Sequence, residues 1–111
     1  METSDLTVVI VTLKSEEVIF TCLDSIPSNI KVIVVENSNN KKFKEELEEK
    51  YKNVNCIIAG ENKGYAVSNN TGLRKVNTKY ALILNPDTEL KKDTIQLFFK
   101  LDKIKKNCKT F

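Results

Sequence analysis

The fold is decided by two stretches, LTVVIV at residues 6–11 and KVIVV at residues 31–35. Both are nearly continuous runs of apolar, mostly β-branched residues, which is the pattern of strands buried on both faces of a parallel sheet. Between them, Ser15 is placed to cap a helix whose apolar residues keep helical spacing until Pro27. The first unit is therefore predicted to be strand, helix, strand.

The rest of the chain continues this alternation. Phe43, Leu47 and Tyr51 recur every four residues among charged residues, which marks an amphipathic helix. Later patterns predict a strand at 54–59, a helix at 65–76, a strand at 80–84 and a last helix at about 93–106. Alternating elements with short links require right-handed crossovers. We expect a single α/β domain over residues 1–111, with a mostly parallel, Rossmann-like sheet of about four strands and helices on both faces.

The composition excludes several classes of protein. With 41% hydrophobic and 30% charged residues in 111, the chain has the makeup of a globular domain. Its apolar runs are far shorter than the roughly 20 residues of a membrane-spanning helix. The acidic first residues lack the basic region of a secretory signal, and a net charge of +3 is too small to indicate a nucleic-acid partner. We expect a cytosolic protein that binds no nucleic acid.

Histidine and cysteine usage limits the available chemistry. The chain has no histidine, so carboxylates, amides, hydroxyls and lysines must carry any reaction. Cys22, Cys56 and Cys108 form neither a metal-ligand pair nor an even disulfide set, which favours buried thiols in a reducing compartment. Residues 91–109 carry seven lysines against two aspartates. A solvated helix face explains them, and so does contact with the inner face of an anionic membrane.

The carboxyl ends of the strands are where a ligand is expected, because open α/β sheets bind ligands in the crevice where the strand order reverses. The first strand is not followed by the glycine-rich turn of a dinucleotide site, and no P-loop sequence occurs. A phospho-receiver domain would need an aspartate after the third strand, where this chain has alanine and glycine. The four ends carry Thr12-Leu13, Glu36-Asn37, Gly60-Glu61-Asn62 and Asn85-Pro86-Asp87.

Two of these ends carry carboxylates. Glu36 can accept hydrogen bonds from the N–H edge of a base or from ribose hydroxyls, although an ordinary loop carboxylate or a helix cap would look the same. Asp87 follows the last strand, two residues after Asn85, and offers a hard oxygen ligand for Mg²⁺ or Mn²⁺ held together with substrate phosphates. A plain turn explains the same residues, because Asn-Pro-Asp-Thr is good turn chemistry.

A loop and a helix start also carry amides and glycines. Asn62-Lys63-Gly64 and Asn69-Asn70-Thr71-Gly72 would let the backbone approach a phosphate or a sugar closely. A flexible loop followed by a helix cap is the alternative explanation.

Taken together, five blocks in order resemble the family 2 glycosyltransferases, and in particular their rhamnosyltransferase-like branch. The blocks are residues 8–12, 32–38, 62–66, 69–72 and 82–88. The resemblance implies the nucleotide-sugar-binding half of a GT-A fold, acting in metal-assisted, inverting transfer of a sugar from a dTDP- or UDP-sugar donor. The implied acceptor is a saccharide or lipid-linked molecule of polysaccharide biosynthesis. The family's catalytic base is a carboxylate well past the metal motif, so none is expected in this chain.

The resemblance also assigns residues to roles. Thr12 matches the position that meets the base and ribose, and Glu36 stands where an aspartate usually reads the uracil or thymine edge. Asp87 matches the last acid of an Asp-x-Asp metal motif whose first acid is replaced here by Asn85. The remaining matches, on the nucleotide and sugar side of the pocket, are Asn62, Gly64 and Asn70.

An alternative from another class stays open. The chain would then be a non-catalytic nucleotide-binding or interaction module that either acts as a sensor or pairs with a partner supplying further strands. An unpaired sheet edge, such as residues 80–84, would favour self-association.

Overall fold

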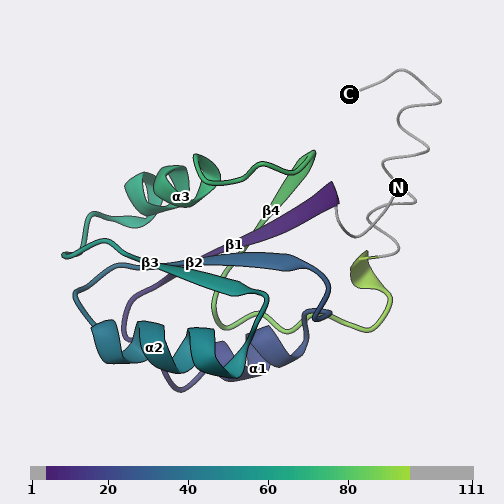
Figure 1. Cartoon of the computed structure of the whole chain (residues 1–111), viewed down its shortest axis with the longest axis horizontal. Helices are drawn as coiled ribbons and strands as arrows, with labels where there is room; N and C mark the ends of the chain where they lie inside the picture. Colours follow the sequence, from purple (N-terminus) through teal and green to yellow (C-terminus); the bar gives the residue numbers. More distant parts are fainter. Residues whose placement is uncertain (1–4, 96–111) are drawn as a thin grey trace.

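The computed structural model describes residues 5–95, which form four strands and three helices (Figure 1). All four predicted strands and the first three predicted helices are present, whereas the last predicted helix, at about 93–106, lies almost entirely outside the described residues. The elements are β1 (Leu6–Thr12), α1 (Ile19–Asp24), β2 (Lys31–Glu36), α2 (Lys41–Lys50), β3 (Val54–Ile58), α3 (Tyr65–Leu73) and β4 (Tyr80–Leu84).

The four strands form one parallel sheet in the order β3-β2-β1-β4. The register pairs Thr12 with Glu36 and Ile10 with Leu84, so the ends of β1 and β2 are level and β4 ends two residues before the end of β1. The predicted α/β fold with a parallel sheet is confirmed. Within residues 5–95, β3 and β4 are the edge strands.

The helices form a layer on each face of the sheet. Figure 1 shows α1 and α2 below the sheet and α3 above it. The lower layer contains the larger core, in which Ile10, Val34 and Leu47 are fully buried. On the upper face α3 approaches very closely, because a Cβ added to Gly72 would lie 2.6 Å from Val9 Cγ1. A glycine at this position therefore sets the distance between α3 and the sheet.

Three helix boundaries differ from the predictions. Ser15 does not cap α1: its carbonyl accepts the N–H groups of Val18 and Ile19, at 3.1 and 2.9 Å, while its hydroxyl bonds to the backbone of Leu13. The chain makes a turn first, and α1 begins only at Ile19.

Helix α1 also ends at Asp24, three residues before Pro27. At this end Ser25 donates its hydroxyl proton to the Cys22 carbonyl, at 2.6 Å. The serine thereby competes for a carbonyl that a longer helix would use. Helix α3 ends at Leu73 instead of residue 76, because the N–H groups of Lys75 and Val76 bond three residues back instead of four.

The segment after β2 supplies the cap of the next helix. Asn40 caps α2, with its side-chain oxygen accepting from the Phe43 N–H at 3.1 Å. No helix within residues 5–95 is long and apolar enough to cross a bilayer.

Candidate functional site

The strand order reverses its direction of growth at the carboxyl ends of β1 and β4. From β1 the chain winds outward through β2 to β3, and then crosses over the upper face to add β4 on the other side of β1. The connections leave neighbouring strands in opposite directions there, which is the position where open α/β sheets bind ligands. The predicted residues after β1, β2 and β4 therefore converge on one edge of the sheet.

At this edge, Thr12 and Glu36 form a buried pair. The Thr12 hydroxyl donates to Glu36 Oε1 at 2.6 Å, and the two residues are 0% and 1% exposed. The Ser38 hydroxyl donates to the other carboxylate oxygen, Oε2. Each oxygen keeps a second lone pair, so the carboxylate remains an acceptor whose position is fixed by two hydroxyls. The predicted contact of Thr12 and Glu36 with a base and ribose stays a prediction.

A second network holds the loop between β3 and α3. Asn37, which is buried, donates from Nδ2 to Asn62 Oδ1 at 3.0 Å. Its own Oδ1 accepts the Lys63 N–H at 2.9 Å and the Ser68 hydroxyl at 2.8 Å. Asn62 Oδ1 also accepts the Gly64 N–H at 3.0 Å. The predicted residues Asn62 and Gly64 are thus brought together and tied to the end of β2.

Neither Asn37 nor Ser68 was among the predicted site residues. The available signals were the position of Asn37, directly after the Glu36 carboxylate, and the position of Ser68, one helical turn after Gly64. Both Gly60 and Gly64 have positive φ, at 88° and 85°, a backbone conformation in which glycine is favoured. These glycines allow the loop to fold back over the strand ends.

The segment after β4 forms the predicted turn, with the Thr88 N–H bonded to the Asn85 carbonyl at 3.0 Å. Asn85 Oδ1 accepts the Tyr65 hydroxyl at 3.3 Å, so the start of α3 contacts this turn. Asp87 is exposed, and within residues 5–95 no hydrogen bond or ion pair involves its carboxylate. Burial and then the nearby Asp87 charge raise the pKa of the Cys22 thiol to about 11. The Cys22 thiol also contacts the Asn85 carbonyl at 3.9 Å, so this turn lies beside α1.

The sequence matches glycosyl transferase family 2 over residues 7–107. The chain belongs to this family. Among its relatives, the low-salt glycan biosynthesis hexosyltransferase Agl10 of Haloferax volcanii is 33% identical over 96 residues, which cover 83% of this chain and 31% of the relative. The teichoic acid poly(glycerol phosphate) polymerase of Staphylococcus epidermidis is 33% identical over 93 residues, 77% of this chain and 13% of that protein.

Solved structures agree with the fold. A fragment of S. aureus TarS in complex with UDP superimposes with a TM-score of 0.71 at 21% identity, covering 86% of this chain and 31% of that chain. The longer TarS structure gives a TM-score of 0.70 at 20% identity and is covered to 19%. The fold is that of the GT-A glycosyltransferases. This family 2 chain spans less than a third of the length of the relatives and structures it matches.

The phase of α3 separates two neighbouring asparagines of this family 2 domain. Asn70, the predicted site residue, is exposed, whereas Asn69 is 6% exposed and faces inward. Asn69 Oδ1 is buried, and no donor to it is found within the described residues. A buried acceptor without a partner costs about 1–3 kcal/mol, so Asn69 is a second candidate for contact with a ligand.

The donors for a metal are few. Within residues 5–95 no group of three or more Asp, Glu, Cys or His side chains is placed to hold an ion. What the turn after β4 offers is the Asp87 carboxylate and the Asn85 amide oxygen, which are both hard ligands. Such a set fits Mg²⁺ or Mn²⁺ in the mode where one carboxylate and substrate phosphates share the ion with water.

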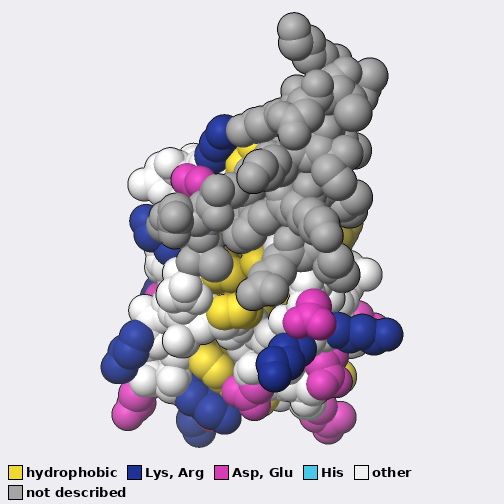
Figure 2. Space-filling model, turned by 90° about the vertical axis from the view of Figure 1, so that its right-hand side faces the viewer, with side chains coloured by type: hydrophobic (Ala, Val, Ile, Leu, Met, Phe, Trp, Pro, Cys, Tyr) yellow, Lys and Arg dark blue, Asp and Glu magenta, His cyan; other side chains and the backbone are white. Residues whose placement is uncertain are grey.

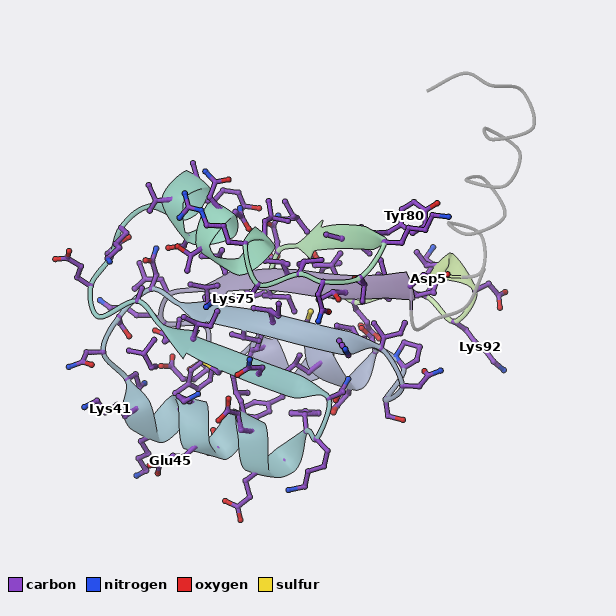
Figure 3. The ribbon with its side chains drawn as sticks, turned by 45° about the horizontal axis from the view of Figure 1, so that its top comes forward. Asp5, Lys41, Glu45, Lys75, Tyr80 and Lys92 are labelled. Carbon is purple, nitrogen blue, oxygen red and sulfur yellow. The ribbon has the colours of Figure 1, made fainter. Side chains whose placement is uncertain are left out.

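A hollow of about 500 Å³ elsewhere on the domain has a different character. It lies along α2, whose Lys41 and Glu45 point away from the sheet in Figure 3, and no strand end lines it. Because its lining comes from one solvated helix, we place the site at the strand ends instead. The residues lining this hollow are Lys42, Glu45, Glu46, Glu49 and Lys50.

Proposed function

We propose that this chain binds the nucleoside diphosphate part of a nucleotide-sugar donor and supplies the donor half of an inverting glycosyltransferase. The observation that carries the proposal is the convergence of the Thr12–Glu36 pair, the Asn37–Asn62 network and Asp87 on one edge of the sheet, at the switch in strand order. Family membership and the resemblance to a UDP-bound TarS fragment support it.

The two networks are proposed to contact different parts of the donor. The Glu36 carboxylate accepts the N–H of a pyrimidine base or a ribose hydroxyl, and its two hydroxyl partners hold it in place before the ligand arrives. The diphosphate lies toward the start of α3, where the first N–H groups have no side-chain cap and favour negative charge. The fixed loop around Gly64 allows the close approach that this requires.

Asp87, with Asn85, would hold Mg²⁺ or Mn²⁺ against the diphosphate. When bound, the ion supplies positive charge that stabilises the departing nucleoside diphosphate. In the transfer, an acceptor hydroxyl oxygen bonds to the anomeric carbon as the bond from that carbon to the phosphate oxygen breaks. The hydroxyl proton passes to a base outside the site described here. The proposed acceptor is a saccharide or lipid-linked molecule, on the cytoplasmic side of the membrane. Free, buried Cys22 and Cys56 fit such a reducing compartment.

Binding tests the proposal directly. The folded chain is titrated with UDP, dTDP, GDP and ADP, each with and without Mn²⁺, while amide NMR shifts are followed. We expect saturable shifts at Thr12, Glu36 and Asp87 that are specific to pyrimidine nucleotides and strengthened by Mn²⁺. Equal shifts with all four nucleotides, or shifts confined to other parts of the domain, would refute the assignment of the site.

Site variants separate the two roles. Glu36→Ala is expected to weaken nucleotide binding with or without metal, whereas Asp87→Ala should weaken it only when Mn²⁺ is present. Dispersed amide spectra serve as the check that both variants remain folded.

The alternative, a non-catalytic interaction module, is favoured by one observation. Strand β4 is an edge strand of the described sheet, and Ile83 on it is 41% exposed. Edge strands with exposed apolar side chains pair readily with other chains. A second copy pairing along β4 would give a dimer in sedimentation at micromolar concentration that Ile83→Lys dissociates. If the chain is a monomer at all concentrations, the interaction-module alternative loses its support and only the donor-binding proposal remains.

A further inference from the structure

A polar hollow of about 240 Å³ lies near the opposite end of the sheet from the strand ends described above. It is formed where β2 and β3 begin, by the loop that leads into β3 and by the loop that follows α3. Its lining residues are Thr7, Lys31, Val32, Ile33, Lys52, Asn53, Val54, Asn55, Lys75 and Asn77. None of the residues proposed to bind the donor takes part in it.

The charges around this hollow all have one sign. Lys31, Lys52 and Lys75 come from three separate segments, and none of the lining residues is acidic. Within residues 5–95, no carboxylate pairs with any of the three ammonium groups. This hollow belongs to the end of the molecule where the strands begin; over the described part of that end lysines and carboxylates are interspersed (Figure 2), whereas the residues that line the hollow itself include no carboxylate. Figure 3 shows Lys75 over the face of the sheet, apart from the charges of α2.

Three lysines line this hollow, and like charges held near one another repel unless an anion lies between them. Lysine binds phosphate as a point charge, and hollows lined by a single sign of charge concentrate ions of the opposite sign. The hollow has the volume of roughly eight water molecules, which is enough for a phosphate group with part of its hydration.

Neutral donors are available beside the lysines. Asn53 is already committed, since its Nδ2 donates to the Ile30 carbonyl at 2.8 Å. Thr7 is also engaged, with its hydroxyl oxygen 2.7 Å from that of Thr78. The side chains of Asn55 and Asn77 line the hollow, and no hydrogen bond within the described residues involves them. Their amide groups can donate to phosphate oxygens.

We propose that the amino-end lysine pocket, defined by Lys31, Lys52 and Lys75, binds a phosphate group. The phosphate belongs either to a small soluble phosphate compound or to the headgroup of an anionic lipid, since both present the same oxygens to the three ammonium groups. The pocket is independent of the donor site and needs neither nucleotide nor metal.

The test is a titration of the full chain with inorganic phosphate at constant ionic strength, using amide NMR, with chloride as the reference anion. We expect saturable shifts at Lys31, Asn55 and Asn77 with little change at Glu36. Each single change, Lys31→Gln or Lys75→Gln, should weaken binding about fivefold, which is the effect of a unit charge lost at about 4 Å in water. Replacing all three pocket lysines by glutamine should abolish saturation.

A matched control removes the same charge elsewhere. Lys41, Lys42 and Lys92 are changed together to glutamine, which leaves the pocket intact. This control should keep the affinity of the unmodified chain within about twofold, because none of these three lysines lines the pocket. If phosphate shifts do not saturate, or if both triple variants lose binding equally, general charge attraction explains the data and the pocket is not a site. If the pocket triple variant does not fold, the phosphate affinities of Lys31→Gln and Lys75→Gln decide whether the pocket is the site.

Vesicles distinguish the two sources of phosphate. Binding to phosphatidylglycerol vesicles that inorganic phosphate displaces, and that the pocket triple variant loses, would identify a lipid headgroup. Saturable phosphate binding without vesicle binding would identify a soluble ligand. Vesicle binding that both triple variants lose equally would overturn the pocket as its cause.

Discussion

Replacing Thr12 by valine should destabilise the domain more than any other removal of one hydroxyl from β1. The substitution keeps the shape of the side chain but deletes the donor that lies 2.6 Å from Glu36 Oε1. Both residues are almost fully buried, so water cannot replace the lost donor. A hydrogen bond to a charged group contributes about 1.5–3 kcal/mol, and we therefore expect the free energy of unfolding to fall by about 2 kcal/mol.

Urea denaturation followed by circular dichroism measures this loss. For a domain of this size, about 2 kcal/mol corresponds to a shift of roughly 1 M in the urea midpoint, or about 10 °C in Tm. Thr12→Ser keeps a hydroxyl at the same place and should recover most of the loss. If the Glu36 carboxylate contacts the base, Thr12→Ser should also bind nucleotide more tightly than Thr12→Val.

Thr7→Val provides a matched control on the same strand. Thr7 is 1% exposed and its hydroxyl contacts the neutral hydroxyl of Thr78, at 2.7 Å. A neutral hydrogen bond contributes about 1 kcal/mol, so this variant should lose about half as much stability as Thr12→Val. If Thr12→Val loses no more than Thr7→Val, the idea that Thr12 stabilises a buried charge is wrong.

Three further outcomes are expected. Gly72→Ala should lower the free energy of unfolding by about 1–3 kcal/mol in urea melts, because the added Cβ would lie 2.6 Å from Val9 Cγ1 and push α3 off the sheet. Glu48→Gln should cost more stability at pH 7 than at acidic pH. The hydrogen bond from Lys44 lowers the pKa of Glu48 below 4.5, and the stability gained from a lowered carboxyl pKa is present above the unfolded value and lost as the pH falls through the folded one, so the Tm gap should close on acidification. Asp87→Ala should leave Tm unchanged, because its carboxylate is exposed, while removing the effect of Mn²⁺ on UDP affinity in calorimetric titrations.

The strands were predictable because burial on both faces leaves a direct trace in the sequence. In β1 every residue is buried, and the β-branched runs report this. The helix starts were harder to predict from the sequence, since a serine before an apolar pattern can cap a helix or form a turn. Ser15 forms the turn, and its backbone carbonyl rather than its hydroxyl meets the first N–H groups. The sequence does not show which of these groups the chain will use.

The candidate site was predictable as a set of strand ends, but its internal contacts were not. The Thr12–Glu36 hydrogen bond depends on the register of β1 and β2, which pairs residues 24 positions apart. The contact of Asn37 with Ser68 spans 31 positions and requires the crossing of α3 over the sheet. The choice between Asn69 and Asn70 depends on helix phase, which the tertiary packing of α3 decides.

Because β4 lies at the edge of the sheet, the proposed site combines residues from two parts of the domain that are expected to form at different stages of folding. Thr12, Glu36 and Asn37 belong to β1 and β2, whose pairing closes a loop of about two dozen residues, whereas Asn85 arrives with β4, which pairs with β1 across more than 70 positions. Longer loops cost more entropy to close, so β4 is expected to dock last and to open first. A ligand that contacts both units would tie them together. Hydrogen exchange at the β4 amides should then slow when donor nucleotide is added, which makes local opening itself a reporter of occupancy.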